Sequence, residues 1–226
     1  MAFIMVLLTF AALIAYDVIK NHRLAEETAA ETAPKKAVTA RGYNFAGSRE
    51  RLEVPQGLYY HQGHTWAKVL SEDTVEIGID DFAQKFVGEI KEIEIPKAGA
   101  KIHQGETAIK IKKGNRTLNL VAPVSGKIVE VNKQVELDPD IINDSPYEDG
   151  WVAKVHPTSL KENLRNLFDS NFAGKWMKLV KYAFKNKYAS EYAFAMQDGG
   201  ELAPGFGMTL KDDEWKDAAE EFFKNY

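Results

Sequence analysis

Two histidines of this 226-residue chain have the spacing of a metal-binding pair. His61 and His64 lie three residues apart near the start of an expected strand, within reach of one ion. The sequence contains no cysteine, and no carboxylate cluster accompanies the pair, so a third ligand is lacking. His22, His103 and His156 are scattered along the chain. We therefore predict that both paired histidines are structural and that the protein has no metal site.

Two pairs of aspartates and one serine have the residue types of a hydrolytic site. Asp80 with Asp81, and Asp138 with Asp140, have the chemistry of a general acid and base. Asp80 begins an expected short helix, and aspartate is favoured as an N-cap or turn former, so neither pair needs a catalytic role. Ser125 lies in Pro-Val-Ser-Gly, which is not the Gly-x-Ser-x-Gly elbow of hydrolases. Because the sequence also has no phosphate loop, dinucleotide fingerprint or triad, we predict no catalytic residues and no enzyme.

A lysine-rich turn is the remaining candidate. Apolar and polar residues alternate over 105–112 and again over 116–122, which predicts two strands around a tight turn. Gly114 and Asn115 stand at this turn, because both tolerate the positive φ that a short hairpin requires. The pattern predicts an exposed, basic hairpin tip.

Segments around this turn resemble a known family. Residues 60–66 read Tyr-His-Gln-Gly-His-Thr-Trp, residues 78–84 read Gly-Ile-Asp-Asp-Phe-Ala-Gln, and residues 122–126 read Ala-Pro-Val-Ser-Gly. Asn-Asp-Ser-Pro-Tyr starts at Asn143, and Gly-Trp follows at Gly150. The series resembles the H protein of the glycine cleavage system. The resemblance covers about half of the chain and implies a barrel-sandwich hybrid whose hairpin carries a lipoyl-lysine.

The resemblance places the lipoyl-lysine position at Asn115. In the family the tip reads roughly Glu-Ser-Val-Lys-Ala, with the lysine seven residues before Ala-Pro-Val-Ser-Gly. Counting back from Ala122 and forward from Gly105 reaches Asn115 both times, and a carboxamide cannot be acylated by a lipoyl ligase. The family's glutamate falls on Lys112, which reverses that charge. We therefore expect no bound cofactor, with lipoylation of Lys112 or Lys113 in a shifted register as the alternative.

An apolar run opens the sequence. Residues 2–19 are apolar at all but three positions, a length sufficient to cross a hydrocarbon core as a helix. No basic residue precedes the run and no small-residue cleavage site ends it, so a transmembrane anchor over residues 1–20 is favoured over a signal peptide. Lys20 and Arg23 follow the run, which predicts a single-pass membrane protein with its folded domain on the cytoplasmic side.

The chain beyond the anchor divides into a tether and a folded domain. Residues 21–53 are rich in Ala, Glu, Thr and Lys, which is typical of a flexible tether. Residues 54–168 carry short strand-like runs separated by Gly, Pro, Asp and Asn, which predicts a mainly β domain with helices, of the α+β class. The expected strands are 65–70, 74–79, 90–95, 107–112, 117–122 and 126–131, and the expected helices are 80–86 and 157–168.

Residues 169–226 are expected to form a helical appendage outside the core of that domain, which would stay folded without them. Over 174–188, apolar residues recur at helical spacing opposite lysines, so this helix either packs on the core or lies on an anionic membrane surface. A second, acidic helix is predicted after a capping box of Thr209 and Asp212. The two helices either pack on each other or bind different partners. Their expected anchors at a partner are Trp176, Leu179, Phe184, Trp215, Phe222 and Phe223.

Together these features predict a non-enzymatic, membrane-tethered module that has lost lipoylation. Its expected role is that of an accessory or scaffold subunit whose partners are other subunits of a membrane protein complex. The net charge of −4 argues against a nucleic-acid binder. The alternative is a genuine lipoyl carrier, modified at Lys112 or Lys113, that serves a glycine-cleavage-like or related transfer system.

Overall fold

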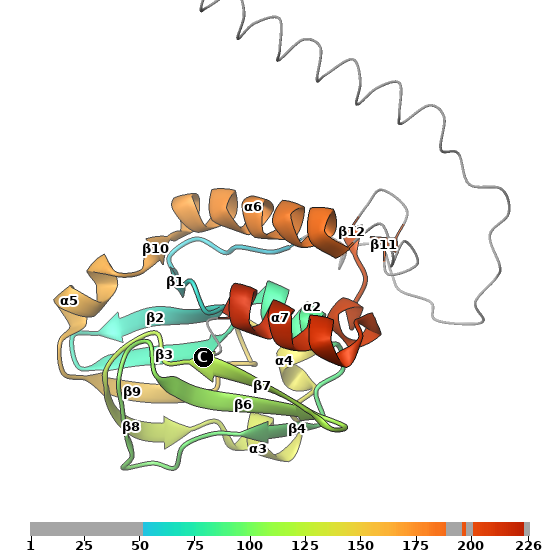
Figure 1. Ribbon diagram of the computed structural model, residues 1–226. Coiled ribbons are helices and arrows are strands. Elements are labelled where there is room, and N and C mark those ends of the chain that lie inside the picture. The colour runs from blue at the N-terminus through green and yellow to red at the C-terminus, as the bar shows by residue number, and fades with distance from the viewer. Residues whose placement is uncertain (1–51, 189–195, 198–200, 224–226) are drawn as a thin grey trace, which may run out of the picture. The chain divides into compact units, whose positions relative to one another are not determined.

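The computed structural model describes residues 52–188, 196–197 and 201–223 (Figure 1). The predicted anchor over residues 1–20 lies outside these residues, as does all but the end of the predicted tether over residues 21–53. Among the helices of the described ranges, none is both long enough and apolar enough to cross a membrane.

Antiparallel sheets and helices make up the described chain. A seven-stranded sheet has the order β10-β1-β2-β3-β9-β8-β5, a three-stranded sheet has the order β4-β6-β7, and β11 pairs with β12. The predicted α+β class is therefore confirmed. The strands are β1 (Tyr59–His61), β2 (Thr65–Ser71), β3 (Thr74–Ile79), β4 (Glu92–Glu94), β5 (Lys101–Ile102), β6 (Thr107–Lys113), β7 (Arg116–Val121), β8 (Gly126–Val131), β9 (Ala153–Pro157), β10 (Phe168–Asp169), β11 (Met196–Gln197) and β12 (Glu201–Leu202). The helices are α2 (Asp81–Val87), α3 (Lys133–Leu137), α4 (Ile141–Asp144), α5 (Leu160–Arg165), α6 (Ser170–Tyr188), α7 (Asp212–Phe223) and the 3-10 helix η2 (Phe206–Thr209).

The alternating apolar pattern located most of the longer strands. Strands β3 and β8 have the predicted bounds, β2 and β6 extend one residue further, and β7 is shifted by one residue towards the N-terminus. Strand β4 is shorter than predicted. The prediction missed five strands of only two or three residues, which are β1, β5, β10, β11 and β12. It also missed β9, which ends on a proline although it lies between β3 and β8 in the sheet.

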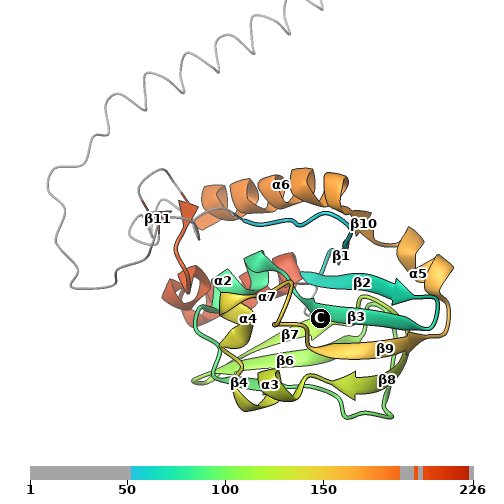
Figure 2. The same cartoon turned by 180° about the vertical axis from the view of Figure 1, so that it is seen from behind.

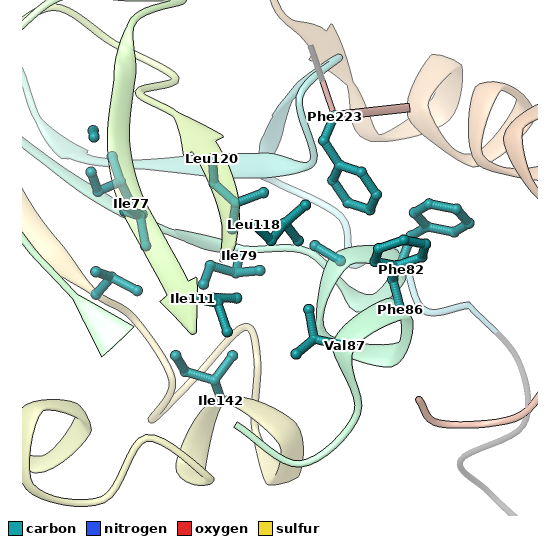
Figure 3. Packing of buried hydrophobic residues seen from close by; sticks show 14 of the residues in the cluster. Ile77, Ile79, Phe82, Phe86, Val87, Ile111, Leu118, Leu120, Ile142 and Phe223 are labelled. Carbon is teal, nitrogen blue, oxygen red and sulfur yellow. The ribbon is translucent and has the colours of Figure 1, made fainter. Parts of the chain in front are cut away.

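The hairpin of β6 and β7 lays one side on the larger sheet. Ile111, Leu118 and Leu120 are buried on the hairpin, and Figure 3 shows them gathered with Ile77 and Ile79 of β3. The intervening hairpin residues are exposed or half-buried. This period of two is what places apolar side chains on the core side of a strand, so the base of the hairpin is part of the core.

Helix α2 begins at an aspartate cap and is buried along its whole length. The Asp80 carboxylate accepts a hydrogen bond from the third residue beyond it (3.0 Å), which confirms the N-cap interpretation. Phe82 and Phe86 face the core as predicted. The Nζ of Lys85 is buried too, and it donates to Asp81 Oδ2 at 2.8 Å. Burial raises the pKa of Asp81 above its ordinary value, and the adjacent Lys85 charge opposes that shift.

The expectation that the domain's core is complete without residues 169–226 is wrong. Helices α6 and α7 pack on α2, as Figure 1 shows, and their buried apolar residues belong to the same core cluster as the strands. The ring centroids of Phe86 and Trp215 are 4.6 Å apart, and those of Phe82 and Phe223 are 5.7 Å apart. Helical periodicity predicted these apolar faces correctly, but it carries no information about which surface covers them.

The buried face of α6 is rotated from the predicted one. Ala173, Met177 and Phe184 are buried, whereas Leu179 is 66% exposed and Trp176 is half-buried. Of the two alternatives for the tail helices, the structure shows that they pack on each other. Their contacts include Phe184 with Phe222, at 5.6 Å between ring centroids, and an ion pair between Lys187 and Glu221.

Two helix boundaries also differ from the predicted ones. Helix α5 is shorter than residues 157–168, because Pro157 ends β9 and Phe168 begins β10. The predicted capping box is wrong: the Thr209 hydroxyl lies in η2 and donates to Phe206 O (2.7 Å). The cap of α7 is instead Glu214, whose carboxylate accepts from the backbone N–H of Lys211 (3.0 Å).

Candidate functional site at the hairpin tip

The turn between β6 and β7 is the predicted two-residue loop. Lys113 pairs with Arg116 across the strand ends, and Gly114 and Asn115 form the loop between them. Gly114 has φ of 61°, whereas Asn115 has no positive φ. This combination fits a type II′ turn, in which glycine takes the first central position. Asn115 is exposed at the tip, so the second central position tolerates any ordinary side chain.

Lysines on the strand before the tip are bound to neighbouring carboxylates and carbonyls. Lys112 lies opposite Glu92 in the sheet and forms ion pairs with Glu92 (3.7 Å) and, more closely, with Glu94. The hydrogen bond and charge of Lys112 lower the pKa of the Glu94 carboxyl, and those of Glu94 raise the pKa of Lys112. Lys113 donates to the backbone carbonyl of Glu89. Both ammonium groups therefore point towards the segment before and within β4, not beyond the tip.

Arg116, on the strand after the tip, is bound to the chain's last described elements. Its Nη2 donates to Leu210 O and to Asp212 Oδ1, both at 2.7 Å. Its guanidinium carbon lies 5.1 Å from the centroid of the Trp215 ring. The Arg116 side chain is only 13% exposed, although Asp212 is 71% exposed. We call this set of contacts the tip clamp, because it fastens the hairpin tip to η2 and α7.

Sequence reasoning missed the tip clamp. Arg116 and Asp212 are 96 positions apart, and no spacing rule connects residues at that separation. The only available signals were an arginine in a turn and an acidic start to the final helix. A charge pattern of that kind does not identify its partner.

The two paired histidines have separate environments. His64 is fully buried, its Nδ1 lies 2.8 Å from Asp80 Oδ2, and its ring stacks on Phe82 and Trp176 with centroids 4.5 and 4.8 Å away. His61 instead accepts a hydrogen bond on Nδ1 from the backbone of Gly63 (2.9 Å). Within the described ranges, no group of three or more potential ligands is placed to hold a metal ion. The structure thus brings His64 together with Asp80 as part of the core around α2.

The remaining predicted candidates lie in capping and loop positions. Asp138 ends α3, and Asp140 precedes α4 without capping it through a side-chain hydrogen bond. Ser125 Oγ accepts from the backbone N–H of Gln104 (2.8 Å), and the Ser125 N–H donates to Asn163 Oδ1 (2.9 Å). These contacts hold the loop before β8. They do not place a base beside the serine hydroxyl.

Comparison with known proteins identifies the family. Residues 58–180, more than half of the chain, match the family model described as Glycine cleavage H-protein. The chain belongs to the glycine cleavage H-protein family. The probable glycine cleavage system H protein of Thermococcus gammatolerans is 39% identical over 126 residues, which cover 56% of this chain and 93% of that relative.

Other H proteins also align with about half of the chain. The mitochondrial glycine cleavage system H protein of Oryza sativa is 42% identical over 118 residues, covering 52% of this chain and 71% of the relative. A crystal structure of the H protein from Mycobacterium marinum is similar with a TM-score of 0.49 and 29% identity, over 54% of this chain and 98% of that one. The family match ends within α6, so η2 and α7, which complete the tip clamp, lie outside it.

Proposed function

We propose that this protein is an H-protein family member that has lost lipoylation and serves as a non-enzymatic, membrane-tethered scaffold subunit. The single observation that carries the proposal is Asn115 at the exposed tip of the hairpin. Counted from the family motifs in the sequence, Asn115 would occupy the position of the lipoyl-lysine. Attachment of lipoate as an amide requires an amine nucleophile, and a carboxamide does not supply one.

The tip clamp supports the proposal. An arm that carries a group between partners needs an attachment point whose surroundings leave it free to swing. In this protein the next residue, Arg116, is bound to Leu210 and Asp212 and lies against Trp215. A tip held in this way is better suited to docking than to transfer.

The contacts of Lys112 and Lys113 argue against the alternative of a lipoyl carrier in a shifted register. Acylation of Lys112 would remove its positive charge and leave Glu92 and Glu94, on the adjacent strand, without their partner. Glu92 and Glu94 lie two residues apart on the same face of β4, where their like charges would then repel each other. Lys113 would have to give up its hydrogen bond to the carbonyl of Glu89.

The membrane part of the proposal rests on the sequence. The apolar run over residues 2–19 would anchor the chain, and the basic residues after it would keep the folded domain on the cytoplasmic side. The partners would be other subunits of a membrane protein complex. Protease added to intact spheroplasts should leave the domain uncut, and the protein should remain on membranes washed with high salt. Cleavage from outside would contradict this topology.

The proposed loss of lipoylation has a direct test with a matched control. The full chain and the double variant Lys112→Glu/Asn115→Lys, which restores the family's two residues, are expressed in cells that contain a lipoyl ligase and free lipoate. We expect no lipoyl group on the wild-type chain and modification of the variant at residue 115. Peptide mass spectrometry of the hairpin gives the readout. A lipoyl group on Lys112 or Lys113 of the wild-type chain would support the carrier alternative instead.

A further inference from the structure

The outward face of α6 is apolar although it is exposed. Phe172, Leu179 and Tyr182 have 54%, 66% and 65% of their surface exposed. Their spacing of seven and three residues places them on one side of the helix. The opposite side, with Ala173 and Met177, is buried in the core, so the helix cannot turn its apolar outward residues inward.

Helix α6 is also strongly basic in a chain of net charge −4. It contains five lysines and no aspartate or glutamate. In the part of the chain that the structure describes, Lys175 and Lys178 are exposed and form no ion pair. Lys175 lies within the apolar strip, three residues from Phe172 and four from Leu179, and Lys178 lies beside the strip. The five lysines are Lys175, Lys178, Lys181, Lys185 and Lys187.

A groove on one flank of α6 adds a site of matching charge. It has a volume of about 600 Å³ and is bounded by the segment from Leu52 to Gln56 and by α6. Lys175, Lys178 and Lys181 contribute to its lining. Lys175 and Lys178 beside one recess favour an anionic group such as a phosphate.

We infer that the outward face of α6 lies on an anionic membrane surface. Phe172, Leu179 and Tyr182 would enter the interfacial layer while Lys175 and Lys178 contact lipid phosphates, which is the arrangement of interfacial amphipathic helices. The choice of occupant rests on the charge complementarity. The inference rests on the proposed function only for the anchor over residues 2–19, which would keep the domain near the bilayer.

The orientation of the domain is consistent with this contact. Figures 1 and 2 show α6 along one outer side, with α2 and α7 on its inner side and α3 at the far side of the sheets. The surface around α3 therefore faces away from any membrane that α6 touches, and it provides a control position.

The absence of cysteine from the chain allows a site-specific test. A single Ala183→Cys places a thiol on the exposed side of α6, and Leu137→Cys places one at an 87% exposed position on α3. Each full-length variant is labelled with an environment-sensitive fluorophore. It is reconstituted into vesicles of phosphatidylcholine, alone or mixed with phosphatidylglycerol. We expect a blue shift at residue 183 only with the anionic lipid, and none at residue 137.

Charge reversal sharpens this test. Lys175→Glu/Lys178→Glu should raise the fraction of anionic lipid needed for the half-maximal shift by about tenfold or move it out of range. The matched reversal Lys101→Glu/Lys127→Glu, at exposed positions on β5 and β8, should leave that fraction of anionic lipid unchanged. The inference is overturned by an unshifted label at residue 183 in anionic vesicles. It is equally overturned by a label already shifted in phosphatidylcholine and insensitive to the reversal, which would mean that protein covers the helix.

The test of the lipid contact of α6 can be distinguished from a test of the proposed membrane anchor. Flotation of the full chain with vesicles in high salt reports the anchor alone, because salt screens the lysines. A chain that does not float contradicts the membrane anchor. In that case, added anionic vesicles still shift the label at residue 183 if α6 binds lipid. A chain that floats but shows no shift at residue 183 supports the membrane anchor and refutes the lipid contact of α6.

Discussion

Two of the places where the C-terminal tail meets the rest of the protein differ in chemistry. At α2 the contact is aromatic and buried, with Phe223 against both Phe82 and Phe86. At the hairpin the contact is polar and partly exposed, with Arg116 bound to Asp212. Burial of aromatic side chains supplies large free energies, whereas ion pairs with an exposed partner supply little. The first contact therefore makes the tail part of the core, and the second fixes the position of the hairpin tip.

Removal of the tail should have the largest effect. Truncation after Phe168 deletes α6, η2 and α7 and exposes the aromatic face of α2. We expect the cooperative melting transition to be lost, with aggregation of the truncated chain. Circular dichroism and scanning calorimetry of the two forms provide the measurement. A truncated chain that melts like the full one would show that the core does not need the aromatic contact.

Replacing one aromatic side chain should show how much of the tail's effect comes from the aromatic contact with α2. Phe223 is fully buried against α2, so Phe223→Ala should lower the free energy of unfolding by about 3–5 kcal/mol. Phe172→Ala removes the same kind of side chain from an exposed position and should change the free energy of unfolding by about 0.5 kcal/mol or less. Denaturant unfolding measures both. Equal losses of stability for the two variants would refute the distinction between the buried aromatic contact at α2 and the exposed side of α6.

Loss of the tip clamp should cost less. Arg116→Ala removes the charged hydrogen bond to the carbonyl of Leu210 and should cost about 1–3 kcal/mol of unfolding free energy. Asp212→Ala should cost about 1 kcal/mol or less, because that carboxylate is exposed. A double-mutant cycle at low and high salt isolates the coupling of the pair. A cost for Arg116→Ala close to that of Phe223→Ala would show that the hairpin contact is energetically equivalent to the aromatic one.

The smallest effect concerns the other side of the hairpin. In the wild-type chain the Glu94 pKa lies below its ordinary value because of Lys112. The pair's contribution to stability is therefore present above the unfolded glutamate pKa of about 4.3 and is lost as pH falls through the lowered folded value. Lys112→Glu should return the Glu94 pKa to its ordinary value or higher. A carboxyl NMR titration measures it, and an unchanged Glu94 pKa would contradict the ion pair.

The sequence predicted local features well and distant contacts poorly. Alternation of apolar residues located β3 and β8, and the Gly-Asn pair located the hairpin loop, because these signals are contained in a few adjacent residues. Asp80 was predicted as a cap for the same reason. The clamp at Arg116 and the cover over Phe86 depend on residues far along the chain, and no local pattern encodes them.

The central claim, that the hairpin carries no lipoyl group, is tested most directly on the protein as the cell makes it. The full chain is purified from native membranes, and its intact mass is measured together with its tryptic hairpin peptides. An H protein known to be lipoylated, taken through the same procedure, serves as the control. The account predicts unmodified peptides across Lys112, Lys113 and Asn115 beside a fully modified control. A lipoyl group on either lysine of the native protein would contradict it.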